Sequence, residues 1–140
     1  VGIKDTIDSI SHISEIIIKV KQKRPDFCVL AGYDDHLLNT LAMGGDGAIP
    51  GTSNFVPELS VRLYESFIKG NFDECIKLHK KLMRLARIYS YDKPSVKLLK
   101  EACRLCGVDV PTFARQPANY IEDSSLKKLE ELLHDCELMD

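Results

Sequence analysis

The sequence predicts an α/β protein in which a parallel sheet is followed by a helical region. In the first half, three short apolar segments alternate with segments of helical periodicity. That alternation is typical of parallel strands joined by crossover helices. From Pro57 onward the periodicity is helical to the end of the chain. Three strand–helix units fit either a small doubly wound sheet or part of an eight-stranded (β/α)₈ barrel, and periodicity alone does not separate the two.

The predicted strands are short and are separated by predicted helices. The strands are Val1–Ile3, the run DFCVLAG at residues 26–32, and residues 47–51, which begin and end with glycine. An uninterrupted apolar run is typical of a strand that is buried on both faces. Residues 5–24 are predicted to be helical because isoleucines recur at helical spacing. Residues 34–44 are predicted to be helical because acidic residues begin the segment and a glycine ends it.

Four helices are predicted in the second half. The first spans residues 57 to about 68, and the second begins after Asn71, which forms a pattern close to a capping box with Glu74. The other two span residues 94–107 and about 125–137. Apolar spacing predicts that the second helix faces the core with one stripe. That stripe consists of Phe72, Ile76, Leu82, Met83, Ala86 and Tyr89.

Composition indicates an ordinary globular protein and excludes some functions. The 140 residues are 44% hydrophobic and 29% charged, which is typical of one domain with one core. The net charge of −2 argues against broad electrostatic binding to nucleic acid or to an anionic membrane. No apolar run approaches the roughly 20 residues of a membrane span. The five cysteines are scattered through apolar segments, which favours reduced structural thiols in a cytoplasmic protein. The pair Cys103 and Cys106 lacks the second ligand pair that a zinc site needs.

Polar residues follow all three predicted strands, at residues 4–6, 32–35 and 51–54. In parallel α/β folds the carboxyl ends of the strands face the active site, so this coincidence is informative. Lys4 has two interpretations. It is either a surface lysine near the start of the chain or a lysine inside a barrel mouth. Burial disfavours an ammonium ion, and a neutral lysine amine can attack a carbonyl to form a Schiff base.

Four motifs occur in order along the chain. They are GIKD at residues 2–5, AGYD at residues 31–34, GGDGAI at residues 44–49, and Asn54 followed by Pro57. Together they resemble the dihydrodipicolinate synthase/N-acetylneuraminate lyase family of class I, pyruvate-dependent aldolases. The similarity continues through the helical region to about residue 120. It implies a (β/α)₈ barrel in which the motif lysine carries the Schiff base.

The resemblance also implies which part of the barrel is present. Lys4 would lie on the sixth strand, residues 1–70 would form strands six to eight, and residues 71–140 would form a C-terminal helical region. The chain would then be the C-terminal half of the family's usual length, with Val1 marking a cut through the barrel. The loop that holds the pyruvyl carboxylate and the tyrosine that shuttles protons would belong to the other half.

The resemblance assigns roles to residues at the first two strand ends. Lys4 would attack the ketone of a 2-oxo acid. Thr6 would share a face with Lys4 and contact substrate hydroxyls, although a strand-end or capping role is equally compatible with its position. Gly32 would let the backbone approach the ligand closely. Asp34 would face the substrate and bind sugar hydroxyls rather than cap a helix, whereas Asp35 would mostly be an N-cap.

Two further substrate-binding positions are implied at the third strand end. Ile49 would present its backbone carbonyl near the Schiff base. Gly51 stands where sialic acid lyases carry a serine, and this departure weakens a sialic acid assignment. The segment GAIPGTSNFVPE at residues 47–58 is closer in appearance to 2-keto-3-deoxygluconate aldolases.

Three functions follow from these interpretations. The first is reversible cleavage of a 2-keto-3-deoxy sugar acid, such as 2-keto-3-deoxygluconate, to pyruvate and an aldehyde. The second is dihydrodipicolinate synthesis from pyruvate and aspartate semialdehyde. The third is an inactive half-barrel that needs the other half and self-associates through its open edges. The expected partners are a small 2-oxo acid and, by family analogy, further copies in a homotetramer. No nucleic acid, membrane, metal or separate cofactor is expected, because the lysine imine itself activates the substrate.

Overall fold

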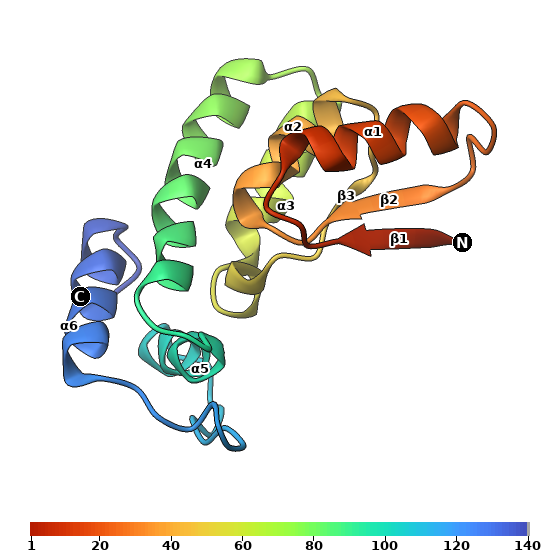
Figure 1. Ribbon diagram of the computed structural model, residues 1–140. Helices are drawn as coiled ribbons and strands as arrows, with labels where there is room; N and C mark the ends of the chain where they lie inside the picture. The colour runs from red at the N-terminus through yellow and green to blue at the C-terminus, as the bar shows by residue number, and fades with distance from the viewer. Residues whose placement is uncertain (140) are drawn as a thin grey trace.

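The computed structural model describes residues 1–139, and its first half contains a three-stranded parallel sheet (Figure 1). The strands lie in the order β1 (Gly2–Asp5), β2 (Cys28–Ala31) and β3 (Gly47–Ala48). Lys4 pairs with Leu30, which pairs with Gly47 on the other side. The carboxyl ends of all three strands therefore meet at one edge of the sheet. The predicted parallel α/β arrangement is confirmed.

Helix α1 (Ile10–Lys21) covers one face of the sheet. Its buried side chains Ile13 and Ile17 pack against Val29 and Ala31 of β2. The alternate residues of β2 are only partly buried, so the prediction that this strand is buried on both faces is wrong for residues 1–139. Lys4 and Leu30, its partner in β2, point to the second face of the sheet. None of the described elements covers this face.

The first predicted helix begins five residues too early. Residues up to Asp5 belong to β1, and the helix begins at Ile10 because Ser9 is its N-cap. The Ser9 hydroxyl accepts a hydrogen bond from the His12 backbone N–H at 3.2 Å. Asp5 is buried and lies 2.8 Å from His12 Nδ1, which holds the end of the strand against the start of the helix.

The second crossover and the helical region complete the fold. After β2 come a 3₁₀ turn (Asp34–His36) and helix α2 (Leu37–Ala42), and a second 3₁₀ turn (Gly51–Asn54) follows β3. The remaining elements are α3 (Pro57–Ile68), α4 (Phe72–Leu85), a 3₁₀ turn (Ala86–Ser90), α5 (Val96–Leu105) and α6 (Asp123–Asp135). Figure 1 shows α3 and α4 side by side, with α5 beyond the end of α4 and α6 beside the C-terminal part of α4.

The turn between α3 and α4 agrees with the sequence pattern. Gly70 adopts a φ of 73°, a left-handed conformation that glycine enters without steric cost and that ends α3. The Asn71 side chain then accepts a hydrogen bond from the Glu74 backbone N–H at 3.3 Å. The predicted cap of α4 is therefore confirmed.

Helix α4 buries Leu82 of the predicted stripe but leaves three other members exposed. The side chains of Phe72, Ile76 and Met83 are 58%, 47% and 51% exposed. The buried residues of α4 are Cys75, Leu78, Leu82 and Leu85. The helix carries two apolar stripes, and packing against α3 decides which of them is inside. The Cys75 thiol, for example, lies 3.7 Å from the Leu63 carbonyl oxygen.

One hydrophobic core joins elements on both sides of residue 70, from Leu37 of α2 to Leu133 of α6. The predicted boundary between residues 1–70 and 71–140 stays a prediction. Within residues 1–139, no helix is long and apolar enough to cross a membrane.

Candidate active site

A cavity of about 570 Å³ lies at the carboxyl end of the sheet. Residues from the ends of all three strands line it, and the 3₁₀ turn before α5 and residues 93–96 form its far side. The cavity brings together five of the six predicted site residues. These are Lys4, Thr6, Gly32, Ile49 and Gly51. Their shared position follows from the parallel register, which aligns the three strand ends.

Lys4 and Thr6 form a contact within this cavity. The Lys4 ammonium donates a hydrogen bond to the Thr6 hydroxyl oxygen at 3.0 Å. The two side chains therefore lie on the same side of the chain, as the alternation of a strand predicts. Both residues are exposed in this structure, so Lys4 is not buried by any element within residues 1–139.

Gly32 makes room for Thr6. A Cβ atom at Gly32 would collide with the Thr6 side chain, including its Cβ and Cγ2 atoms at 2.8 Å. The Gly32 backbone N–H also donates to the Asp5 carbonyl oxygen at 2.6 Å. The sequence suggested that this glycine lets a ligand approach, whereas the structure shows the Thr6 side chain in that space.

Asp34 does not line the cavity, so the prediction that it faces the substrate is not supported by the structure. Its exposed fraction is 0%, and the chain turns into a 3₁₀ helix at this residue, which leaves the preceding Tyr33 on the cavity side. The Asp34 carboxylate accepts hydrogen bonds from the Thr52 backbone N–H at 3.2 Å, from the Thr52 hydroxyl, and from the Tyr89 hydroxyl at 2.6 Å. Asp34 therefore links the second and third strand ends to the turn that carries Tyr89.

The predicted N-cap role of Asp35 is also wrong. The N-cap position of the 3₁₀ turn is Tyr33, and no side chain caps it. The Asp35 Oδ1 atom is buried without a hydrogen-bond partner among the described residues.

The electrostatics of the Asp34 cluster follow from its burial. Burial raises the pKa of Asp34, although the hydrogen bonds from Thr52 and Tyr89 act in the opposite direction. Burial and the neighbouring Asp34 charge raise the pKa of Tyr89, which keeps the phenol protonated at neutral pH. Tyr89 is thus the donor and Asp34 the acceptor in their hydrogen bond.

The raised pKa of Asp34 predicts a pH dependence of stability. The folded protein binds this proton more tightly than the unfolded chain does. The resulting stabilisation is complete below the ordinary carboxyl pKa of about 3.9 and is lost as pH rises through the folded-state pKa. We expect the unfolding free energy of wild type to exceed that of Asp34→Asn by more at about pH 4 than at about pH 7. Denaturant titrations at both pH values measure this difference.

Asp26→Asn is the matched control, because hydrogen bonding to Arg24 lowers the pKa of the Asp26 carboxyl. The stabilisation from Asp26 is present above the ordinary carboxyl pKa of about 3.9 and is lost only at lower pH, so the difference between wild type and Asp26→Asn should not rise from about pH 7 to about pH 4. The same trend in both variants would contradict the assignment for Asp34.

Sequence reasoning missed Tyr89 as a residue of the site. It lines the cavity, whereas the apolar spacing predicts only a structural residue of the α4 stripe. Its ring meets the Tyr33 ring edge-on, with centroids 6.3 Å apart. Tyr89 is 55 positions from Asp34 in the chain, and no local pattern connects the two.

The third strand end is held by backbone hydrogen bonds. The Ile49 N–H donates to the Ala31 carbonyl oxygen at 2.8 Å, and the Asn54 side chain donates to the Gly51 carbonyl oxygen at 2.8 Å. The proposed role of the Ile49 carbonyl beside a Schiff base stays a prediction.

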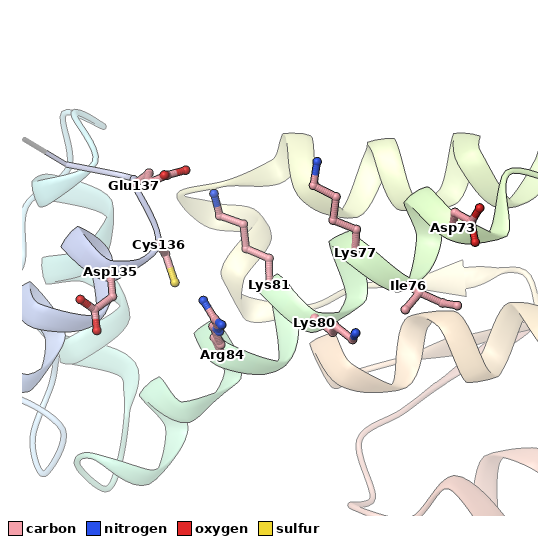
Figure 2. A pocket seen from close by; sticks show the side chains of 9 residues that line it. All are labelled: Asp73, Ile76, Lys77, Lys80, Lys81, Arg84, Asp135, Cys136 and Glu137. Atoms are coloured by element: carbon pink, nitrogen blue, oxygen red, sulfur yellow. The ribbon is translucent and has the colours of Figure 1, made fainter.

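A second cavity, of about 440 Å³, lies between α4 and the end of α6 (Figure 2). Four cationic side chains line it, but they do not converge, because Lys77 and Lys81 extend to one side of α4 and Lys80 to the other. Acidic side chains line the same groove, including Asp135 and Glu137. None of the predicted site residues lies here, so the cavity at the strand ends is the better candidate.

The remaining cysteine and metal candidates do not form a site within residues 1–139. No cluster of three His, Cys, Asp or Glu side chains in this part of the chain could hold a metal ion. Burial raises the pKa of both Cys103 and Cys106, which favours their neutral thiols. The Cys103 thiol lies 3.5 Å from the Asn54 carbonyl oxygen, a contact within the core.

Comparison with known sequences identifies curated relatives of this chain. The probable 2-dehydro-3-deoxy-D-pentonate aldolase YjhH of Escherichia coli K12 is 44% identical over 133 residues, which are 95% of this chain and 44% of that protein. The putative 2-dehydro-3-deoxy-D-gluconate aldolase YagE of the same organism is 42% identical over 138 residues, which are 99% of this chain and 46% of that protein. The chain therefore spans about half the length of the curated relatives it matches.

Solved structures show the same relationship. The crystal structure of YagE in complex with pyruvate, a protein of the dihydrodipicolinic acid synthase family, matches with a TM-score of 0.95. The match covers 99% of this chain and 46% of YagE at 42% identity. Dihydrodipicolinate synthase from Thermotoga maritima matches with a TM-score of 0.90 at 29% identity, over 99% of this chain and 46% of that one. The family model described as the dihydrodipicolinate synthetase family matches residues 1–136. The chain belongs to the dihydrodipicolinate synthetase family.

Proposed function

We propose that this chain is the C-terminal part of a (β/α)₈ barrel that acts as a pyruvate-dependent class I aldolase. The observation that carries the proposal is the position of Lys4, whose amine lies beside Thr6 in a cavity formed by three aligned strand ends. Catalytic residues of (β/α)₈ enzymes come from the carboxyl ends of several strands. Family membership and the aldolase names of two relatives support the same conclusion.

In this proposal Lys4 forms a covalent imine with the substrate. The neutral amine attacks the C2 ketone of a 2-oxo acid, and loss of water gives a protonated imine. The C3–C4 bond then breaks as the C4 hydroxyl loses its proton, the aldehyde departs, and the electron pair moves into the imine as an enamine. Protonation at C3 and hydrolysis release pyruvate and regenerate the amine. The imine is the electron sink, so the proposal requires no metal or separate cofactor.

Thr6 is the residue of this chain best placed to orient the amine. Its hydroxyl oxygen accepts a hydrogen bond from Lys4, and Gly32 leaves the space in which its side chain lies. We propose that this contact directs the amine toward the cavity before the imine forms. The groups that bind the pyruvyl carboxylate and shuttle protons would come from strands one to five.

The proposed substrate is a 2-keto-3-deoxy sugar acid such as 2-keto-3-deoxygluconate. The names of the two relatives at 42% and 44% identity support this choice. The alternative is condensation of pyruvate with aspartate semialdehyde, which the structural match to a dihydrodipicolinate synthase at 29% identity supports less strongly.

The two unpaired edges of the sheet support the barrel proposal, because further strands of a barrel would pair with them. The outer edges of β1 and β3 are unpaired among the described residues, and unpaired edges are prone to association. We propose that the other barrel strands pair with both edges in the full-length protein. The homotetramer and the cytoplasmic location stay predictions. So does the possibility that the isolated chain is an inactive half-barrel.

Product analysis tests the proposed activity. The full-length protein would be incubated separately with 2-keto-3-deoxygluconate and with pyruvate plus aspartate semialdehyde, and products would be followed by mass spectrometry. We expect release of pyruvate and an aldehyde in the first reaction. Turnover in only the second reaction would replace the aldolase with the synthase, and no turnover in either would overturn both.

A further inference from the structure

The Tyr89 hydroxyl occupies the space that a side chain at residue 51 would fill. A Cβ atom added to Gly51 would collide with this hydroxyl, and it would lie 3.2 Å from Tyr89 Cζ. Both residues line the same cavity as Lys4. Gly51 and Tyr89 are therefore complementary. The missing side chain at residue 51 leaves room at the end of the third strand for the Tyr89 hydroxyl, which comes from the 3₁₀ turn after α4.

Asp34 fixes the direction in which the Tyr89 hydroxyl can form hydrogen bonds. The Tyr89 O–H donates to Asp34 at 2.6 Å, and the same carboxylate accepts two hydrogen bonds from Thr52. All three groups are donors, and an ionised carboxylate can accept from all of them. The phenol proton is thus committed to Asp34, and the phenol oxygen offers only lone pairs to a further partner.

A ligand group that approaches this oxygen must donate a hydrogen bond. A hydroxyl group can do so, whereas a carboxylate cannot and would also meet the nearby charge of Asp34. The edge-on contact with Tyr33 holds the Tyr89 ring from the cavity side, which limits its freedom to turn away. The Tyr89 phenol oxygen, oriented by Asp34 and held in place by Tyr33, is thus a hydrogen-bond acceptor at a fixed position in the cavity.

We propose that Tyr89 is a specificity-determining residue that selects a hydroxyl group on the aldehyde portion of the substrate. This inference rests on the proposed aldolase function. Asp34 is the positioning residue that orients the phenol, and Gly51 is the residue that admits it. The proposal assigns selection for hydroxyl groups to Tyr89, in place of the direct contact with Asp34 that the sequence suggested.

The test compares two aldehydes in the full-length enzyme. Aldol addition of pyruvate would be measured with glyceraldehyde, which carries hydroxyl groups, and with propanal, which lacks them. In Tyr89→Phe, we expect the ratio of kcat/KM for glyceraldehyde to that for propanal to fall about three- to tenfold, the effect of one neutral hydrogen bond. Because this is a ratio within one preparation, partial unfolding of the variant does not change it. Tyr120→Phe is the matched control, since Tyr120 is 70% exposed and is not among the residues that line the cavity.

Gly51→Ala provides a second variant, because its methyl group would displace the Tyr89 hydroxyl. We expect the same fall in the ratio, and we expect the double variant with Tyr89→Phe to show no further fall. An unchanged ratio in Tyr89→Phe, or equal falls in it and in Tyr120→Phe, would overturn this inference. Borohydride reduction with pyruvate separates the two proposals. An imine adduct with an unchanged ratio overturns only the role of Tyr89, whereas no adduct in wild type overturns the aldolase proposal and this inference with it.

Discussion

Replacement of Lys4 by arginine is expected to lower kcat/KM for aldol cleavage by about 10³-fold or more in the full-length enzyme. The guanidinium group keeps the positive charge and most of the length of the side chain, but it does not lose its proton and cannot form an imine. The loss would therefore report the covalent step rather than charge or packing. Pyruvate release from 2-keto-3-deoxygluconate measures the effect.

The control for this experiment is Lys127→Arg, which makes the same chemical change at an exposed position of α6. Its kcat/KM should equal that of wild type. Retention of activity within about tenfold in Lys4→Arg would be incompatible with covalent catalysis by this residue, because a guanidinium group cannot form the imine.

Truncation of Leu82 to alanine is expected to cost about 2–5 kcal/mol of unfolding free energy. Leu82 is fully buried in the core that joins α3, α4 and α6, so its removal leaves a cavity. The adjacent Met83 is 51% exposed, and Met83→Ala should change the unfolding free energy by less than about 0.5 kcal/mol. Chemical denaturation of the two variants measures both values.

This pair of variants tests which stripe of α4 faces the core. The sequence placed both residues in one inward stripe, and that interpretation predicts a large loss for each. The structure predicts a large loss only for Leu82. Comparable losses in the two variants would show that the outward stripe of Phe72, Ile76 and Met83 is also packed in the folded protein.

The parts of the fold that the sequence predicted are those with a local cause. Apolar runs bounded by glycines mark the strands, and Asn71 with Glu74 marks the start of α4. Polar strand ends could be expected to meet because parallel register aligns them. This reasoning placed Lys4 and Thr6 together, and the structure confirms their contact.

The parts that it missed depend on contacts between distant segments. α4 has two apolar stripes, and its sequence does not say which one meets α3. The roles of Gly32 and Gly51 depend on the Thr6 and Tyr89 side chains that fill their missing Cβ space. Asp34 could be read as facing the cavity or the interior. Only the three-dimensional position of Tyr89 shows that Asp34 faces the interior, where Tyr89 donates a hydrogen bond to it.

Borohydride reduction in the presence of pyruvate tests directly whether Lys4 forms the imine. An imine between the Lys4 amine and pyruvate would be reduced to a stable secondary amine, and peptide mapping would locate the added mass. We expect one pyruvate-derived adduct in the full-length protein, on the peptide that carries Lys4, and no adduct in Lys4→Arg. An adduct on a different lysine, or none after reduction of active wild-type enzyme, would contradict the assignment of Lys4 as the imine-forming residue.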